Sequence, residues 1–216
     1  MACRDYTVAL FRVDTPPRAS LNIPMTAAIL LPDNWELRKE LENLPDNVTG
    51  EVIGGTLYTM GRPRPSHAMV EANVGTDLIR GGRGGPPPPS GWVVLPEVEI
   101  LFPTGESAVP DLSGWHDERI AGHLDENPIT VVPDWICEIL SSSTRRKDLG
   151  VKRAFYAAQG VPHLWIIDPD ELQLDAFALE RGGWRLLASY FDDDTANVAP
   201  FEGTPLLLSN WWLRKK

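Results

Sequence analysis

The chain has little of several residue classes, and each shortage excludes a class of protein. Only two cysteines, Cys3 and Cys137, occur among 216 residues, which is neither a disulfide framework nor the spacing of a zinc site. The apolar runs, such as AAILL, are far too short to span a membrane. The N-terminus lacks a basic segment followed by an apolar stretch, so we expect no signal peptide and a cytoplasmic location.

Basic residues are also scarce, with 20 Lys and Arg against 30 Asp and Glu, for a net charge of −10. This balance counts against a general nucleic-acid binder, whose binding surface is usually basic. It does not exclude an enzyme that meets nucleic acid through one local patch and a metal ion. The remaining composition, 43% hydrophobic and 23% charged, is typical of a soluble globular protein.

No long linker divides the chain, so we expect one domain over residues 1–216. An irregular arm at 1–24 and a Gly/Pro-rich surface loop at 81–91 are expected within it. Apolar spacing predicts a helix in the second half of 26–44, and another over 66–80 that Ser66 caps.

Strand-like runs fill much of the remainder. A hairpin is predicted around Gly54 and Gly55, and an antiparallel pair closes the sheet over ELQLDAFAL and WRLLASYF. WVVLPEVEILF, AVPDLSGW, VVPDWICEIL and HLWIIDP also read as strands, with a helix over 144–159. The fold class is therefore α/β or α+β, a central mixed sheet flanked by helices. Residues 133–168 should form a right-handed parallel crossover.

Glu138 interrupts an apolar strand and demands a partner. Strand alternation places it on one face with Ile136 and Leu140, where a lone carboxylate must be protonated, paired or bound to a cation. The following helix offers Lys152, although a helical wheel puts Val151, Phe155 and Ala158 deepest and Lys152 only on the flank.

Gly150 lies inside that helix and costs stability there, so we expect another backbone to come close to it.

A second acid stands in a similar setting, Asp111 in VPDL, where the preceding proline indicates a strand start or edge. Two carboxylates and a lysine in a cleft suit metal-assisted phosphodiester hydrolysis. The acids hold a hard divalent cation, and the ammonium stabilises negative charge as it develops.

These pieces resemble the PD-(D/E)XK nuclease superfamily, in particular its Uma-type family of restriction-endonuclease-like proteins. The resemblance covers roughly 51–212 and rests on GEVIGGTLYTM, PRPSH, VPDL, PDWICEILS, KDLGVKRAFY and GVPHLWIIDP in this order. It implies a restriction-endonuclease-like central mixed sheet, DNA as substrate, Mg²⁺ (or Mn²⁺ as a substitute) as cofactor, and a homodimer.

The resemblance also implies site residues. Asp111 would be the acid of the first half-motif and Glu138 that of the second, both as metal ligands. Orthodox members place the lysine where Leu140 stands, so the resemblance points to Lys152 from the next helix. Glu51 matches an acid before the hairpin, as an auxiliary ligand or a base that orients water. His67 matches a recurrent family histidine, to which we assign no role.

Other interpretations stay open at this stage. Asp111 also fits a turn cap, Glu138 a partner of an arginine, and Lys152 a surface partner of Asp148. Trp211 and Trp212 fit either a dimer interface or the core. The whole chain also fits a catalytically silent module of the same fold that serves nucleic-acid or protein interaction, or a magnesium hydrolase of a smaller phosphoester.

Two further acidic features are read as structural. Asp134 is taken as a turn residue, and the run 192–194 as a solvated turn, because the spacing of a calcium loop is missing.

Overall fold

Two β-sheets and the helices packed on them organise the part of the chain that the computed structural model describes, residues 35–80, 89–141 and 145–212. The expected arm at 1–24 and most of the expected loop at 81–91 lie outside these ranges. No helix in them is both long enough and apolar enough to cross a membrane.

The larger sheet has six strands in the order β10-β9-β8-β7-β6-β3. Their bounds are Gly183–Phe191, Gln173–Glu180, His163–Asp168, Trp135–Ile139, Leu112–His116 and Trp92–Pro96. β7 and β8 run parallel, as predicted for the crossover, and the other neighbours are antiparallel, so the sheet is mixed as expected.

A smaller sheet has the order β2-β1-β5-β4. These strands are Thr56–Met60, Thr49–Ile53, Ser107–Ala108 and Ile100–Leu101. The predicted hairpin is confirmed, because β1 and β2 pair around Gly54 and Gly55, whose φ angles of 60° and 67° are those of a two-residue turn that favours glycine. WVVLPEVEILF, predicted as one strand, divides instead into β3 and β4 in different sheets, with Glu97 at φ 46° between them.

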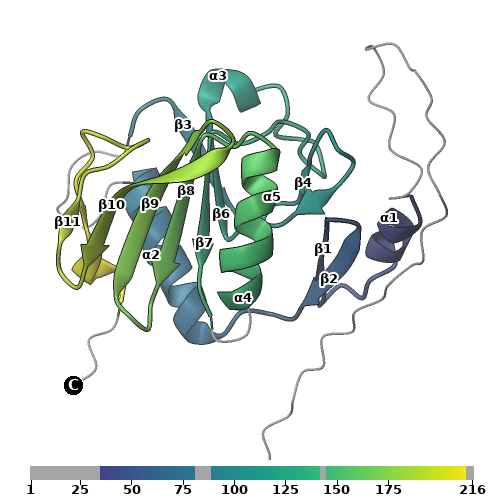
Figure 1. The fold of residues 1–216 in the computed structure, drawn as a ribbon, viewed down its shortest axis with the longest axis horizontal. Coiled ribbons are helices and arrows are strands. Elements are labelled where there is room, and N and C mark those ends of the chain that lie inside the picture. Colours follow the sequence, from purple (N-terminus) through teal and green to yellow (C-terminus); the bar gives the residue numbers. More distant parts are fainter. Residues whose placement is uncertain (1–34, 81–88, 142–144, 213–216) are drawn as a thin grey trace, which may run out of the picture.

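Two helices sandwich the six-stranded sheet. α2 (Pro65–Arg80) covers one face and α5 (Arg153–Ala158) the other, and Figure 1 shows them behind and in front of the sheet. α2 begins one residue before Ser66, so the prediction of Ser66 as a cap is wrong. Proline at the first helical position suits the helix because it lacks an N–H.

The faces of β7 agree with the strand alternation. Trp135, Cys137 and Ile139 pack in the core on the α2 side, and Ile136 and Leu140 pack on the α5 side. Every residue of this strand is buried. Glu138 therefore faces an apolar layer, as the sequence predicted.

The C-terminal segment completes the core on the α2 side. β11 (Thr195–Ala196) pairs with β12 (Leu206–Leu207), and a short 3₁₀-helix (Leu208–Asn210) follows. Trp211 and Trp212 are 0% and 7% exposed, so of the two open readings the core is confirmed.

The smaller sheet and helix α1 (Trp35–Glu42) form one flank of the molecule, next to the end of the helical segment that precedes α5. α3 (Asp117–Ile120) lies at the opposite end of the six-stranded sheet, after β6. The carboxyl end of β7 thus meets the smaller sheet, and the acidic side chains converge there.

Candidate active site

The candidate site is built around the carboxylate of Glu138, near the carboxyl end of β7. Its side chain is 2% exposed. Nζ of Lys152 lies 2.8 Å from its Oε1, and the hydroxyl of Tyr156 donates to the same oxygen at 2.6 Å. The partner that an acid in this strand demands is thus a lysine and a tyrosine from the next helix, and not an arginine.

Lys152 joins Glu138 to a carboxylate of the smaller sheet. Its Nζ lies 2.8 Å from Oε1 of Glu51, which β1 carries, and 3.5 Å from the main-chain oxygen of Val109. Lys152 is 2% and Glu51 0% exposed. The ammonium therefore sits between two buried carboxylates, and the reading of Lys152 as a surface partner of Asp148 is wrong.

Glu51 is held on both oxygens. Its Oε2 lies 2.7 Å from Nζ of Lys147, and its Oε1 accepts the N–H of Val109 at 2.9 Å. Burial alone would raise the pKa of Glu51, but Lys152 and Lys147 together lower it below its ordinary value. Glu51 is thus an anion fixed between two cations.

Asp111 stands immediately before β6, beside β7. Its Oδ2 accepts the N–H of Ile139 at 2.5 Å. The pairing of β6 with β7 ends at Leu112 and Cys137, so the Asp111 side chain binds a backbone N–H just past the end of that pairing. Its Oδ1 lies 3.0 Å from Nε2 of His67 on α2. Asp111 is therefore bound to the residue that follows Glu138, and it is not a turn cap.

A π-helical turn positions the lysines. The helix predicted over 144–159 is confirmed in outline, but it consists of α4 (Arg145–Lys147), a π-turn (Asp148–Lys152) and α5. Such a turn accommodates one extra residue and occurs frequently at functional sites. The extra residue rotates Lys152 inward.

Because of this rotation, part of the burial pattern predicted from the helical wheel is wrong. Lys152 and Tyr156 are buried, whereas Val151 is only partly buried and Ala158 is exposed, so the prediction that Val151 and Ala158 lie deepest is wrong. The explanation for Gly150 is also wrong, because no atom lies within 4 Å of the place where its Cβ would stand.

The electrostatics of Glu138 favour a cation. Burial raises its pKa well above the ordinary value; Lys152 opposes the rise, while Asp111 and Asp148 add to it. Burial also acts against the charged form of Lys152, but Glu138 and Glu51 outweigh it and raise the lysine's pKa.

The donor set suits a hard divalent ion. Glu51 and Glu138 are paired with Lys152, and Glu51 also with Lys147, while Asp111 and Asp148 add negative potential at Glu138. In the described residues no three acidic, His or Cys side chains converge closely enough to form a metal cage alone. Asp111 and Glu138 offer carboxylate oxygens, the ligand type of an ion such as Mg²⁺, which typically uses one or two carboxylates and completes its shell with water and phosphate oxygens.

The four predicted site residues therefore meet at one end of the sheet, and three neighbours were missed or left without a role. Tyr156 lies four residues after Lys152, on the same side of the helix, and this spacing is the sequence signal that could have identified Tyr156 as a site residue. Lys147 had no signal, because its contact with Glu51 arises only when α4 and β1 come together in the fold. His67 contacts Asp111, and its pKa is raised, since Asp111 outweighs the effect of burial.

Asp134 lies outside this cluster. Its carboxylate accepts the N–H of His116 at 3.0 Å and bonds to Arg119 at the far end of the sheet. This structural role agrees with the turn reading.

The chain is similar to a known family over most of its length. The family model Uma2, described as "Putative restriction endonuclease", matches residues 35–209. Among solved structures, a "putative nuclease belonging to DUF820 from Anabaena variabilis" has a TM-score of 0.61 at 19% identity, over 81% of this chain and 96% of that one. At this identity the likeness shows the fold. None of the curated proteins matches the chain.

Proposed function

Because the chain belongs to the Uma2 family of restriction-endonuclease-like proteins, we propose that it is a metal-dependent endonuclease that hydrolyses DNA phosphodiester bonds. The observation that carries the proposal is the ion network Glu51–Lys152–Glu138 with Asp111 bound beside it. Buried acids and a buried lysine destabilise a fold through the loss of their hydration. A catalytic role in stabilising charge at a phosphate would explain why they are present.

Each residue then has a role. Asp111 and Glu138 would hold Mg²⁺, or Mn²⁺ as a substitute. When bound, the ion supplies a polarised phosphate and a water of lowered pKa. Lys152 stabilises negative charge as it develops. Glu51 places Lys152 and Lys147, because its carboxylate is paired with both ammonium groups; this positioning role suits it better than that of a base.

Two further expectations belong to the same proposal. The two strands of a duplex need two cuts, which a homodimer makes with its two sites, so we expect the active form to be a homodimer. Its interface does not include Trp211 and Trp212, which are buried in the core. Sedimentation of the protein with and without DNA tests the assembly.

A second candidate is a catalytically silent module of the same fold. One observation favours it: the ammonium of Lys152 already has Glu51, Glu138 and the oxygen of Val109 as neighbours. Such a module would use the ion network for stability alone. It would bind neither Mg²⁺ nor a scissile phosphate there.

Calorimetry with Mg²⁺ at neutral pH separates the candidates, on wild type and on Glu138→Ala. We expect binding to the wild type and its loss in the variant, followed by cleavage of plasmid DNA that Lys152→Ala abolishes. A wild type that binds neither Mg²⁺ nor Mn²⁺, while the variant is folded, would favour the silent module.

A further inference from the structure

Lys147 connects the buried ion network to the surface. Its side chain is 13% exposed, against 2% for that of Lys152, although both lysines bind the same carboxylate of Glu51. Its Nζ also lies 2.8 Å from Sδ of Met60 and 5.8 Å from the centre of the Tyr58 ring. Glu51 and β2 therefore hold Lys147 at the rim of the site, where an incoming anion can reach it.

Three arginines lie in the chain segments next to Met60 and Lys147, and they have no partners among the described residues. Arg62 and Arg64 lie in the segment between β2 and α2, and Arg146 precedes Lys147 on α4. All three are exposed, and within the described residues none of their guanidinium groups forms an ion pair or a hydrogen bond. Arg145 differs, because it pairs with Asp168 at 2.5 Å.

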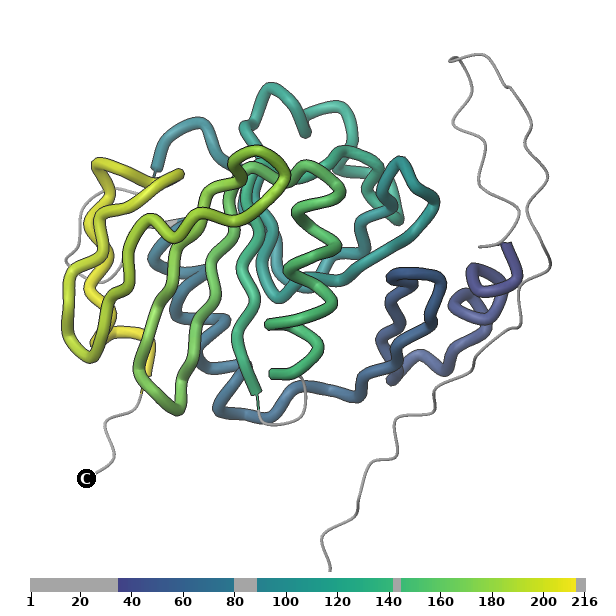
Figure 2. Tube along the Cα trace, viewed as in Figure 1, coloured from purple at the N-terminus to yellow at the C-terminus, as the bar shows by residue number. Residues whose placement is uncertain are grey.

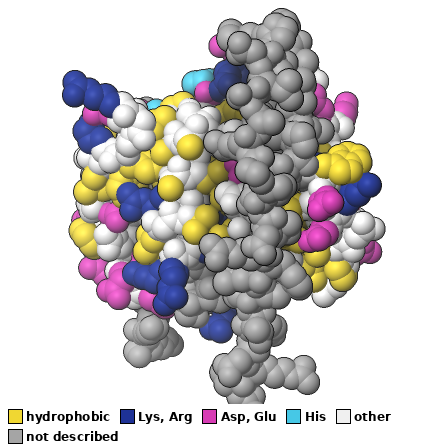
Figure 3. Space-filling view, turned by 45° about the vertical axis from the view of Figure 1, so that its right-hand side comes forward, with side chains coloured by type: hydrophobic (Ala, Val, Ile, Leu, Met, Phe, Trp, Pro, Cys, Tyr) yellow, Lys and Arg dark blue, Asp and Glu magenta, His cyan; other side chains and the backbone are white. Residues whose placement is uncertain are grey.

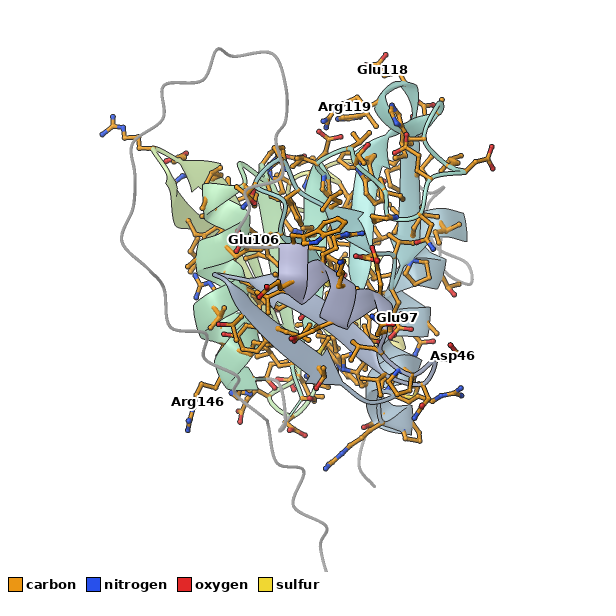
Figure 4. All side chains as sticks on the ribbon, turned by 90° about the vertical axis from the view of Figure 1, so that its right-hand side faces the viewer. Asp46, Glu97, Glu106, Glu118, Arg119 and Arg146 are labelled. Atoms are coloured by element: carbon orange, nitrogen blue, oxygen red, sulfur yellow. The ribbon has the colours of Figure 1, made fainter. Side chains whose placement is uncertain are left out.

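The contacts of Lys147 bring these arginines to one end of the molecule. Met60 ends β2, so Arg62 and Arg64 lie two and four residues after the residue that Lys147 contacts. The segment 61–66 contains no acid, and neither does 145–147. Figure 4 places Arg146 at the lower edge of the molecule and Arg119 at the upper edge. Figure 3 shows Lys and Arg side chains at the lower left and the bottom of the face it draws, with Asp and Glu beside some of them, and others at its upper left and right.

Two segments with bases and no acid, 61–66 and 145–147, stand out in a chain of net charge −10. Free, solvated guanidinium groups contribute little to stability, so the fold does not need them there. They suit phosphate, which arginine binds with two parallel hydrogen bonds, and binding releases the counterions of the nucleic acid.

We propose that Arg62, Arg64, Arg146 and Lys147 form the surface that binds the phosphodiester backbone and delivers it to Asp111 and Glu138. Lys147 marks the inner end of this basic surface, and the three arginines hold the flanking phosphates. The inference rests on the proposed function for the reaction itself, but the binding surface can be tested without cleavage.

The experiment uses a fluorescent 30-base-pair DNA duplex, with EDTA to prevent cleavage, and follows its anisotropy at several salt concentrations. Arg62→Ala/Arg64→Ala is compared with Arg181→Ala/Arg185→Ala. The control pair lies at or after the β9–β10 turn, at the other end of the sheet, and removes the same charge. We expect the first variant to lose about tenfold or more in affinity at low salt, with the slope of log K against log salt shallower by about two.

Arg146→Ala should shift the slope by about one, and the control pair should leave it unchanged. Equal losses in the two double variants would reduce the effect to net charge and overturn the inference, as would a wild type that binds no duplex. If the wild type binds DNA through these residues but never cuts it with Mg²⁺, the proposed binding surface is supported and the proposed nuclease activity is refuted. If the arginine variants cleave DNA as well as the wild type does, the nuclease activity is supported and the binding surface is refuted.

Discussion

Glu71 is a single residue whose pKa, raised by burial and by neighbouring acids, makes the stability of the fold depend on pH. It lies on α2, 9% exposed, one helical turn after His67. Burial raises its pKa to about 7, with further contributions from Glu97, which Figure 4 labels, and Asp111, against the opposing effect of His67. A carboxyl group whose folded pKa is raised favours its neutral form, so its ionisation costs stability as the pH rises.

Glu71→Gln should therefore make the protein more stable at high pH but not at low pH. The contribution of the neutral carboxyl is fully present below about 4.5 and is lost as the pH rises through about 7. We expect the gain of the variant to grow over this range to about 2–3 kcal/mol at pH 8. Urea unfolding at several pH values in EDTA measures it.

The control for this prediction is Glu118→Gln, an exposed acid on α3 at the other end of the sheet. It should change the free energy of unfolding little at any pH. A constant difference between Glu71→Gln and wild type from pH 5 to pH 8 would contradict the burial argument.

The element scale separates what the sequence predicts from what it does not. Strand alternation predicted the faces of β7 because a side-chain period of two leaves no freedom once one face is buried. The β1–β2 hairpin was predictable because two glycines at positive φ suit its turn. The π-turn was not predictable. Its hydrogen bonds from residue i to i+5 have no compositional signal, so the sequence of the segment looks like that of an ordinary α-helix.

The candidate site divides in the same way. Glu138 was predictable from one sequence alone, because an acid in an apolar strand must have a partner. Asp111 and Lys152 needed the family resemblance to select them, since acids near strand starts are common. Lys147 escaped both approaches: its contact with Glu51 joins two elements that are 96 residues apart.

Two glycines of the same helical segment should respond in opposite ways to alanine. Gly150 is exposed in the π-turn, with open space at its Cβ position and no positive φ. Gly150→Ala should therefore stabilise the protein by about 0.5–1 kcal/mol. Gly160 follows α5 with φ 76°, so Gly160→Ala should destabilise it by about 1–2 kcal/mol.

Thermal unfolding measures both changes, which correspond to a few degrees in Tm at about 2–4 °C per kcal/mol. Gly160→Ala serves as the internal control, because the two substitutions add the same methyl group. Destabilisation by Gly150→Ala would mean that the glycine itself is needed for the π-turn.

At the scale of the whole molecule, two sources of negative charge must be kept apart. The chain carries −10 overall, which any salt screens, while Asp111 and Glu138 form a local acidic site in which Asp111 raises the pKa of Glu138. Both sources favour a divalent ion over a monovalent one, but only the second depends on Glu138 rather than on an acid elsewhere on the surface.

Magnesium should thus raise the melting temperature of the whole protein. An ion that binds only the folded state adds about 2.7 kcal/mol at a hundred times its Kd, or roughly 5–10 °C for a chain of this size. Scanning fluorimetry with MgCl₂ against NaCl at matched ionic strength measures the shift, and EDTA should reverse it. Glu138→Gln should abolish it, because one of the two proposed ligands is lost, whereas Glu171→Gln, an exposed acid in the turn before β9, should keep it. An equal rise in wild type and Glu138→Gln would instead attribute the effect to the general acidity of the chain.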